Sequence, residues 1–506
     1  MTGRLPIEDR RYQDDVIHEI KKLLASGVRR VLLQAETGSG KTIIAVKIIY
    51  SAVALGEPVV ILVHTDELIG QMSLKLLSFG IAFGVIKNGH PMHLHRPVQL
   101  ASIQTLHSRA FRSKKIPLPE ADWLFIDEAH RSRARTWMQV IESYPNAYVI
   151  GLSATPCRLD GKGLGNIFEE LVCCPDADEL QNLKFLAPAR VWAPSRPDLR
   201  GIKVRAGDYV ECELEKRVNT GKLVGDIVSH WFRLAEGSPT ICFATSVAHS
   251  MHIVEEFKKA GVAAAHIDGA TPREERKQIL RDLANGKIKV ISNCAVLTEG
   301  WDSPLASCAI LARPTKSLGL YRQMIGRVRR PAPGKIHAIV LDHSGGCFVH
   351  GLPNDKIIWA LARDEKTVNR THEARGKDPH TPRLTTCPRC SAVREEGRPC
   401  PQCGWRPQRQ PKPVDIADGE LAEIGRDRRP QPAKLTVVEQ RAFYQQLMGV
   451  ARQREYKPQW AAHKYKEKFG VFPPWGWNNL APLPPGGEVS AWVRSRNIAY
   501  AWRTGR

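Results

Sequence analysis

The sequence predicts an α/β protein with two doubly wound parallel-sheet domains in tandem, followed by a small cysteine module and a small, mostly helical C-terminal segment. Two observations predict the domains: short apolar runs alternate with amphipathic stretches over the first 190 residues, and the alternation restarts at Thr240. Continuous apolar runs are typical of parallel strands covered on both faces, and the amphipathic stretches are typical of the helices between them. A third observation, the polar composition after Asp342, marks the end of the second domain. The length of 506 residues accommodates two large domains with appendages.

The individual elements follow from the apolar runs. In the first series we expect strands at Val28–Gln34, Pro58–His64, Val98–Ser102, Trp123–Ile126 and Tyr148–Leu152, with helices at Thr42–Ala54 and Glu67–Phe79. In the second we expect strands at Thr240–Ala244, Lys289–Ser292, Ala309–Arg313 and Ala338–Asp342, with helices at Val247–Ala260, Arg273–Ala284 and Leu318–Arg330. The stretch Ala187–Gly237 is too irregular for its elements to be assigned.

The predicted domain organisation has six parts. Residues 1–190 and 191–350 form the α/β domains, 351–385 a linker, 386–404 the cysteine module, 405–433 a disordered Pro/Arg-rich linker and 434–506 a basic, aromatic, helical segment. In this last segment Phe443, Leu447 and Val450 share one face of a helix.

Composition narrows the class of protein. The apolar runs are all shorter than the 18 or so residues of a membrane span, and the first residues lack a signal-peptide pattern, so we expect a cytoplasmic protein with no membrane partner. The 12 cysteines are then expected as thiols or metal ligands. The net charge is +22, and residues 376–506 hold 23 Lys+Arg against 12 Asp+Glu. Such a basic appendage indicates phosphate-backbone binding, or a surface kept soluble by charge.

A glycine-rich loop lies between the first expected strand and the first expected helix. Ala35-Glu36-Thr37-Gly38-Ser39-Gly40-Lys41-Thr42 matches a P-loop, whose backbone N–H groups bind phosphates at a helix N-terminus. Lys41 is expected to reach the β- and γ-phosphates of ATP, and Thr42 to hold Mg²⁺. Ala35 stands where the general pattern has glycine. The predicted nucleotide-binding residues of this loop are Glu36, Thr37, Gly38, Ser39, Gly40, Lys41 and Thr42.

A pair of acidic residues ends a buried strand further along the chain. Leu124-Phe125-Ile126 is followed by Asp127-Glu128-Ala129-His130. Asp127 is placed to hold Mg²⁺ and Glu128 to polarise the attacking water, because phosphoryl transfer depends on positioning and charge compensation. The alternative is that the two acids only cap the next helix.

These residues resemble motifs of the superfamily 2 helicases, the DEAD/DEAH-box group. Asp127–His130 resembles motif II, Ser153-Ala154-Thr155 resembles motif III, and Arg11-Tyr12-Gln13 resembles the adenine-reading element. The resemblance implies a RecA-like fold for both α/β domains and an adenine contact for Gln13. It also implies that His130, Ser153 and Thr155 couple the ATP state to the strand-binding surface.

The resemblance also extends to motifs that contact the nucleic-acid strand. His64-Thr65-Asp66-Glu67-Leu68 and Ser102-Ile103-Gln104-Thr105-Leu106 resemble strand-contacting motifs, although Thr105 alone suits an ordinary loop hydroxyl equally well. The nucleic-acid contacts implied are His64, Thr65, Gln104, Thr105, Thr245 and Thr298.

Two motifs of the second half complete the set. Thr298-Glu299-Gly300-Trp301-Asp302 resembles motif V, with Asp302 implied in nucleotide binding and Trp301 where the family has a smaller residue. Gln323-Met324-Ile325-Gly326-Arg327-Val328-Arg329-Arg330 matches motif VI. Arg327 and Arg330, three apart on the expected helix, are predicted to stabilise charge on the γ-phosphate, with Gln323 part of the same catalytic set. The alternative for this helix is an exposed basic face.

The order of the motifs predicts a mechanism. The P-loop belongs to one domain and the arginines to the other, so the ATP site is complete only when the domains close. Hydrolysis reopens them, and strand contacts on both domains then grip alternately, which is translocation.

A cysteine array follows the second domain. Cys387, Cys390, Cys400 and Cys403 form a C-x₂-C-x₉-C-x₂-C pattern, which suits a closed tetrahedral Zn²⁺ site of structural type, in a zinc knuckle or ribbon. The remaining cysteines, including Cys173 and Cys174, are scattered and fit a packing role.

The C-terminal segment interleaves basic and aromatic residues. Tyr456–Trp460 and His463–Phe469 combine lysines with aromatic rings, a composition that suits stacking on unpaired bases. Core building and protein docking are the alternatives for the same aromatics.

Taken together, residues 10–404 resemble RadD-type DNA helicases of bacteria and prophages, through the motifs above, the cysteine array and the Ser153–Gly163 run. The resemblance implies an ATP-dependent DNA helicase or translocase in repair, recombination or replication, acting on single-stranded or branched DNA, with a protein partner open for the C-terminal segment. Three alternatives remain: an RNA helicase, a restriction-type translocase subunit, and an ATP-gated adaptor that binds DNA without unwinding it.

Overall fold

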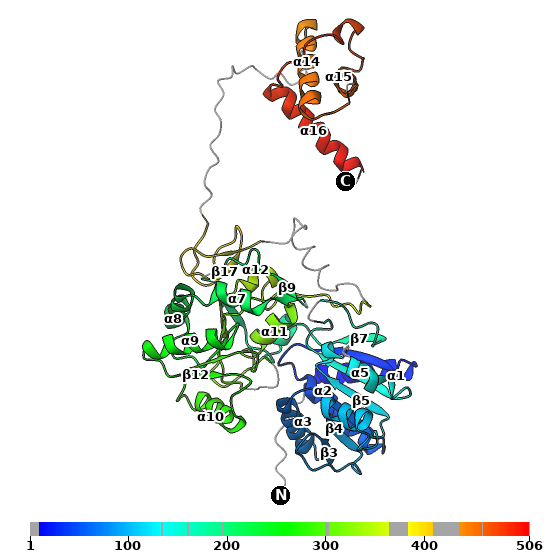
Figure 1. The fold of residues 1–506 in the computed structure, drawn as a ribbon, viewed down its shortest axis with the longest axis vertical. Helices are drawn as coiled ribbons and strands as arrows, with labels where there is room; N and C mark the ends of the chain where they lie inside the picture. Colours follow the sequence, from blue (N-terminus) through cyan, green and yellow to red (C-terminus); the bar gives the residue numbers. More distant parts are fainter. Residues whose placement is uncertain are drawn as a thin grey trace. The chain divides into compact units, whose positions relative to one another are not determined.

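The structure, a computed structural model, describes two compact units. The first extends to Arg409 and the second begins at Gln410. The residues described are 10–132, 135–158, 161–194, 197–205, 207–298, 303–363, 383–407, 435–457 and 459–504. The first unit holds both α/β domains and the cysteine module, and the second is a small helical bundle (Figure 1).

The first domain is built on a seven-stranded, fully parallel sheet in the order β3-β4-β2-β5-β6-β1-β7. The strands are β1 (Arg30–Gln34), β2 (Val59–Val63), β3 (Phe83–Ile86), β4 (Val98–Ser102), β5 (Trp123–Asp127), β6 (Tyr148–Ser153) and β7 (Glu170–Cys173). The helices are α1 (Arg11–Ala25), α2 (Lys41–Ala54), α3 (Asp66–Ser78), α4 (Ile103–Leu106), α5 (Arg135–Glu142) and α6 (Ala177–Asn182), with short turns η1 (His107–Arg112) and η2 (Ala129–Arg131).

Both faces of this sheet are covered. Within β1, Val31 and Leu33 pack in one core with α1, α2 and α3, whereas Leu32 packs in the opposite core with α4 and α5. Because successive strand residues point to opposite faces, an uninterrupted apolar strand is what a doubly covered sheet requires.

The second domain repeats the architecture with a six-stranded parallel sheet in the order β12-β13-β11-β14-β15-β8. The strands are β8 (Ala189–Trp192), β11 (Thr240–Phe243), β12 (Ala264–Ile267), β13 (Val290–Asn293), β14 (Cys308–Leu311) and β15 (Ala338–Asp342). The helices are α7 (Glu211–Val218), α8 (Gly221–Ala235), α9 (Val247–Lys259), α10 (Arg273–Ala284), α11 (Leu318–Gly326) and α12 (Gly346–His350), and β9 (Val204–Arg205) pairs with β10 (Asp208–Tyr209). The two RecA-like, parallel-sheet domains predicted from the sequence are confirmed.

The structure also differs from the sequence-based expectations in detail. Strands β3, β7 and β12 were not predicted. Each lies at an edge of its sheet and is not buried along its whole length, unlike the four-residue strands β11, β13 and β14. The region left unassigned contains β8, an edge strand of the second sheet, so the predicted boundary between residues 190 and 191 falls within β8. Helix α11 ends at Gly326 rather than at Arg330. Arg327 and Arg330 therefore do not share the face of one continuous helix.

The cysteine module is packed against the second domain. Its strands β16 (Leu384–Thr386) and β17 (Val393–Glu395) form an antiparallel pair. The N–H of Ala193 donates to the Ser391 carbonyl (3.1 Å), just beyond the end of β8. Cys387 and Cys400 pack in the same core as Trp192, so the module extends the hydrophobic core of this domain.

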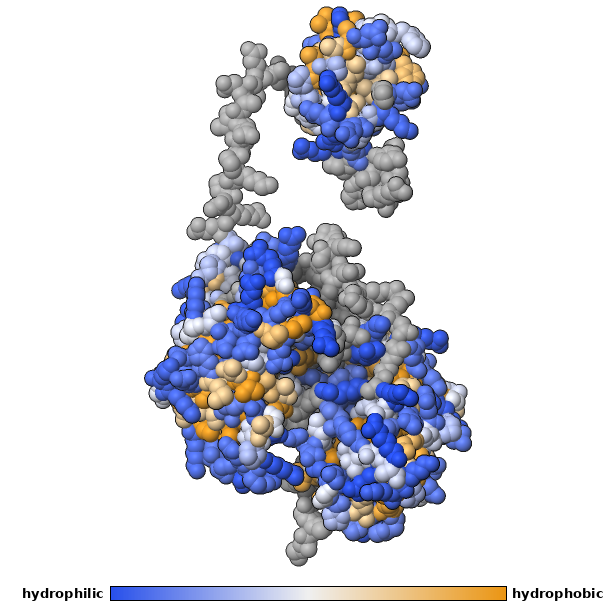
Figure 2. Space-filling view, in the orientation of Figure 1, coloured by the Kyte–Doolittle hydropathy of each residue, from blue (hydrophilic) through white to orange (hydrophobic). Residues whose placement is uncertain are grey.

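The second unit has its own core. It consists of α14 (Val437–Gln453), α15 (Trp460–Phe469), the short 3₁₀ helix η3 (Trp475–Trp477) and α16 (Gly487–Thr504). Phe443, Leu447 and Val450 are buried on one face of α14, as predicted. Figure 2 shows that both units expose mainly hydrophilic side chains with apolar ones scattered among them.

Across the described residues, no helix combines the length and the apolar character that crossing a bilayer requires.

Candidate nucleotide site and metal centre

The glycine-rich loop joins β1 to α2 in left-handed turns. Gly38 has φ +94° and Gly40 has φ +96°, and Gly40 immediately precedes the first residue of α2. These φ values favour glycine at both positions, and a Cβ atom at Gly40 would also stand 2.7 Å from the Gln13 side-chain nitrogen and displace it. The loop thus presents its backbone N–H groups at the N-terminal end of a helix, which favours an anion such as phosphate.

Lys41 meets both acids of the Asp-Glu-Ala-His sequence. Its Nζ lies 2.5 Å from Glu128 Oε1 and 3.7 Å from Asp127 Oδ1. Burial alone lowers the pKa of Lys41, but attraction to Glu128 and Asp127 outweighs it and raises the pKa. The pKa of Asp127 is raised, chiefly by burial. Burial opposes ionisation of Glu128 too, yet Lys41 and His130 hold its pKa well below the usual range.

The charges at this position suit a divalent cation. The buried carboxylates of Asp127 and Glu128 share one lysine, so their negative charge exceeds its positive charge. Carboxylate oxygens are the ligands that Mg²⁺ prefers, and they lie beside the phosphate-binding loop. Glu128 also has a left-handed backbone conformation (φ 53°, ψ 54°) at the end of β5. A non-glycine residue held in that region stores backbone strain, a feature that clusters at functional sites.

A buried polar chain leads from Glu128 towards the second domain. His130 Nδ1 lies 3.3 Å from Glu128 Oε2 and 3.5 Å from Ser153 Oγ. The Ser153 hydroxyl donates to the Thr155 carbonyl (2.6 Å). A Cβ atom at Gly319 of α11 would stand 2.8 Å from Thr155 Oγ1, so Thr155 touches the second domain directly. His130, Ser153 and Thr155, which the resemblance implies in coupling the ATP state to the strand-binding surface, therefore form one path from Glu128 to the second domain.

The residues predicted to read adenine lie at the P-loop. The Tyr12 hydroxyl and the Arg10 guanidinium both donate to the Ser39 carbonyl. Gln13 is 1% exposed, and its side-chain oxygen has no hydrogen-bond partner among the described residues. A buried amide acceptor without a partner fits an amino group such as that of adenine. Phe185, over which Arg10 stacks at 4.3 Å, was missed because it lies far away in the sequence.

Motif VI contacts the P-loop from the second domain. A Cβ atom at Gly326 would stand 2.4 Å from Thr37 Cβ, and one at Gly38 would stand 3.4 Å from Arg330 Cγ. Burial, with repulsion from Arg10, lowers the pKa of Arg330 to about 10. Gln323 is buried and lines a small cavity with His130 and Thr155.

Arg327 is held by motif V. Its Nε and Nη2 atoms donate to the Thr298 carbonyl at 3.0 and 2.6 Å. Its charge also opposes that of Lys41, which places its guanidinium in the electrostatic reach of the P-loop. Asp302, predicted to contact nucleotide, lies outside the described residues.

Sequence reasoning missed two ion pairs that join the domains. Arg322 Nη1 lies 2.8 Å from Glu36 Oε1, with Arg322 buried and Glu36 partly buried, and Arg276 of α10 pairs with Glu67 of α3. No sequence pattern predicts these ion pairs. The partners are 286 residues apart in the Arg322–Glu36 pair and 209 in the Arg276–Glu67 pair, and they meet only when the domains dock.

Residues 351–363, which we call the strap, also bridge the domains. The Asp355 carbonyl accepts from Arg322 Nη2 (2.7 Å), and Asn354 accepts from Arg329 of the second domain while donating to Gln181 of the first. The N–H of Gly165 donates to the Ala362 carbonyl (2.9 Å). This segment, predicted as a linker, is thus an ordered part of the domain interface.

The residues predicted to contact nucleic acid differ in their location and exposure. His64 and Gln104 follow neighbouring strands β2 and β4, and Gln104 donates to the His64 carbonyl (3.2 Å). Thr65 caps α3, accepting from the N–H of Leu68 (3.3 Å), and Thr105 is half-buried.

Thr245 and Thr298, the two predicted contacts in the second domain, are both buried. Thr245 is fully buried and its hydroxyl donates to the Ala312 carbonyl (3.4 Å), so its side chain has no surface for a strand in this conformation. Thr298 is buried, with its carbonyl bound to Arg327.

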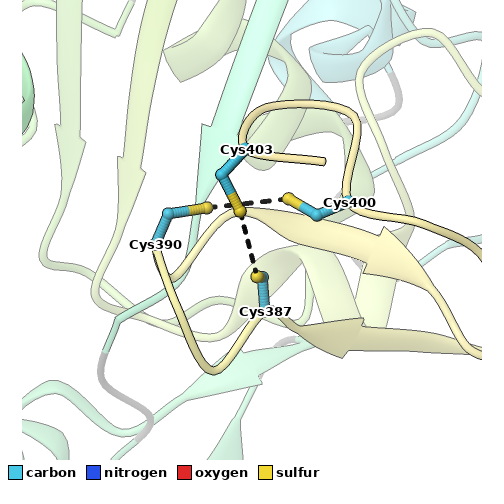
Figure 3. Close-up of side chains that lie close together, drawn as sticks. All are labelled: Cys387, Cys390, Cys400 and Cys403. Carbon is cyan, nitrogen blue, oxygen red and sulfur yellow. Dashed lines mark hydrogen bonds between the residues drawn. The ribbon is translucent and has the colours of Figure 1, made fainter. Parts of the chain in front are cut away.

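The four predicted metal ligands converge. The sulfur atoms of Cys387 and Cys403 lie 3.7 Å apart, those of Cys390 and Cys400 lie 3.6 Å apart, and all four lie within 4.8 Å of one another (Figure 3). Tetrahedral zinc with Zn–S distances near 2.3 Å spaces its sulfurs roughly 3.8 Å apart. The cluster is therefore compatible with a structural zinc knuckle.

Comparisons with known proteins agree with this geometry. Residues 6–158 match the family model "Type III restriction enzyme, res subunit", and residues 222–332 match "Helicase conserved C-terminal domain". A 51.5 kDa protein of Lactococcus phage is 31% identical over 329 residues, 65% of this chain and 68% of the phage protein. IRC3 of Saccharomyces cerevisiae, whose name classes it as an ATP-dependent helicase, is 29% identical over 67% of this chain and 52% of its own length.

Restriction enzymes also resemble the chain. The type I restriction enzyme EcoAI endonuclease subunit of Escherichia coli is 25% identical over 67% of this chain and 46% of its own length. A fragment of an HsdR-type subunit of a type I restriction enzyme from Vibrio vulnificus YJ016 shares the fold, with a TM-score of 0.53, 21% identity and 70% coverage of both chains.

The chain spans about half the length of several of these relatives. Its two α/β domains nevertheless carry the P-loop, the Asp127–His130 sequence and motif VI, and all three lie within the residues that the two family models match. The chain therefore belongs to superfamily 2 of the helicases, as an ATP-hydrolysing enzyme.

Proposed function

We propose that this chain is a DNA-dependent ATPase that moves along or remodels DNA. The observation that carries the proposal is the contact between motif VI of the second domain and the P-loop of the first, at Gly326–Thr37 and Arg330–Gly38. An ATP site divided between two domains makes hydrolysis and domain movement parts of one cycle.

In this proposal each side chain acts through its position. Lys41 and the N–H groups of the P-loop bind the phosphates, and Gln13 binds the adenine edge. Asp127 holds Mg²⁺, which compensates the charge that develops during phosphoryl transfer. Glu128 orients the attacking water, and Lys41 and His130 keep it ionised for that task. Arg327 and Arg330 approach the γ-phosphate from the second domain when the domains close.

In this proposal the coupling to DNA involves one contact between the domains and one surface of the first domain. One is the path His130–Ser153–Thr155, which ends on Gly319 of α11. The other is the exposed end of the first sheet, where His64 and Gln104 lie together. A change at Glu128 on hydrolysis alters the first contact, and the strand bound along the second then shifts relative to the second domain. Repair, recombination or replication is the role we propose for such a motor.

The resemblance to restriction enzymes favours a second candidate, a translocase subunit that works with a separate nuclease. It is favoured by the family model matched by residues 6–158 and by the EcoAI relative. Both candidates share the same motor and differ in the partner.

The proposed function is tested by ATP turnover with a panel of nucleic acids. Single-stranded, duplex and forked DNA are compared with RNA of the same sequence, with Lys41→Ala as the inactive control. We expect stimulation by DNA well above that by RNA. Stronger stimulation by RNA would replace the proposal with an RNA helicase, and equal turnover with and without any nucleic acid would refute it.

A further inference from the structure

The loop between α15 and η3 presents two aromatic side chains to solvent. Helix α15 ends at Phe469, and Gly470 (φ 78°) turns the chain away. Trp475 is 91% exposed and Phe472 is 50% exposed. Burying an aromatic ring is among the largest apolar gains available to a small domain, so two rings left in solvent are unexpected.

The loop itself is firmly anchored. The Trp477 ring packs against the rings of Tyr444 and Tyr465 at 6.4 and 6.0 Å. The Tyr444 hydroxyl donates to Asn478 Oδ1 (3.2 Å), and the N–H of Trp477 donates to the Pro474 carbonyl (2.9 Å). The outward rings are therefore held on a fixed scaffold, since the neighbouring tryptophan of the same loop packs inward.

A lysine of α15 lies over one of the outward rings. Lys466 Nζ is 4.4 Å from the centroid of Phe472, and the His463 ring meets the same ring edge-on at 5.5 Å. The two neighbouring lysines are engaged elsewhere: Lys464 pairs with Glu467 at 2.6 Å, and Lys468 lies over Phe443 in the core.

The surroundings are positively charged. Residues 435–504 contain 10 Lys+Arg against 4 Asp+Glu, and no acidic residue occurs between Glu467 and Glu488. A basic surface repels a basic partner and attracts a polyanion. A polyanion that also offers flat apolar faces is single-stranded nucleic acid, whose bases stack on aromatic side chains without regard to sequence.

We propose that Trp475, Phe472 and Lys466 form a stacking site for the unpaired bases of a single strand. The inference rests on the proposed function, in which the motor domains bind a DNA strand. It adds a second site for that strand, outside the motor domains. Within His463–Phe469 two aromatics fit the core-building alternative instead, because Tyr465 is buried and Phe469 packs against Phe443. In a duplex the bases stack on one another, so the site discriminates against paired DNA.

The test measures binding of the full chain, without nucleotide, to a labelled oligothymidine, to an abasic strand of equal length and to a duplex. Trp475→Ala is expected to weaken oligothymidine binding by about 5- to 100-fold, the loss of one stacked base. The slope of log affinity against log salt should stay unchanged, because stacking releases no counterions. Lys466→Ala should instead reduce that slope by about 0.7.

The abasic strand and the controls decide the cause. Wild type and Trp475→Ala should bind the abasic strand equally, Trp475→Phe should retain most of the oligothymidine affinity, and Val438→Ala, which alters another exposed side chain of this unit, should change nothing. Unchanged oligothymidine binding by Trp475→Ala overturns the site and leaves a protein as the occupant. An equal loss on the abasic strand also overturns it. Failure of the proposed function is a separate result, namely wild-type ATPase that no nucleic acid stimulates.

Discussion

Single residues of the ATP site are held by compensating charges. Lys41 is buried between Glu128 and Asp127, and each of the three charges depends on the others for its protonation state. Without nucleotide, Lys41 thus occupies the acids that Mg²⁺ and water require. We expect bound phosphate to compete for Lys41 and so to release the Glu128 carboxylate for the attacking water.

Lys41→Ala is expected to reduce ATP turnover by at least 10³-fold, because it removes a phosphate-contacting charge. The fold should survive, since Lys41 is the first residue of α2 and alanine is a good helix former. Steady-state hydrolysis with saturating DNA measures the effect, and circular dichroism checks the fold. Near-normal turnover in a folded variant would refute the assignment of the P-loop.

Arg330→Ala is expected to keep nucleotide binding and lose hydrolysis by about 10³–10⁵-fold, as removal of an arginine finger does. Arg329→Ala is the matched comparison, because Arg329 bonds to Ala187, Pro353 and Asn354 and is expected to affect domain docking instead. Binding of a labelled ATP analogue separates the two effects. If Arg330→Ala loses binding as severely as turnover, Arg330 has a structural role.

The Glu36–Arg322 pair is expected to stabilise the closed arrangement of the domains. Glu36→Gln and Arg322→Gln should each lower kcat/KM for ATP, since each leaves a charge at the domain interface without its partner. The double variant should lose less than the sum of the two, with a coupling of about 0.5–3 kcal/mol, as for residues in direct contact. Additive losses would show that the pair does not act as a unit.

At the residue scale, the site residues that could be predicted were those that belong to a motif of consecutive residues. Lys41, Asp127 and Glu128 each belong to a short motif beside a recognisable strand. Glu36 belongs to the P-loop and Arg322 directly precedes motif VI, but their pairing depends on how the two domains dock. A single sequence contains no trace of that contact.

At the scale of elements, long apolar strands such as β2 were easy to predict, because parallel strands covered on both faces are continuously apolar. Short edge strands such as β3 and β7 were not, since tertiary pairing rather than pattern defines them. The packing of the cysteine module against β8 could not be predicted from the sequence either. Its four ligands were predictable from spacing, whereas its hydrophobic contact with Trp192 was not.

Loss of the zinc site is expected to affect more than the module. Cys400→Ser should release one Zn²⁺ per chain and unfold residues 384–405, since closed tetrathiolate sites contribute on the order of 10–16 kcal/mol to small domains. Because Cys387 and Cys400 pack with Trp192, the thermal stability of the second domain should also fall. Elemental analysis and differential scanning calorimetry measure the two effects. A wild-type chain without zinc, or a variant with an unaltered melting profile, would contradict the account.

At the scale of the whole molecule, the chain combines an ATP site completed by two domains with a separate basic helical unit. The unit at residues 410–506 carries the outward aromatic loop, and the motor carries the site that hydrolyses ATP. An enzyme that only hydrolysed ATP would need neither the interdomain path through Thr155 nor the outward aromatic loop for which we propose a strand contact. Both features are accounted for by movement along nucleic acid.

The most direct test of that claim is displacement of a roadblock by the full chain. Streptavidin on biotin-labelled ends of single-stranded DNA and a third strand on a triplex report movement along single strands and along duplex. The account predicts ATP-dependent displacement from at least one of these substrates by the wild type, and none by Lys41→Ala or Arg330→Ala. DNA-stimulated ATP hydrolysis without displacement from either substrate would contradict it and identify the chain as an ATP-gated adaptor.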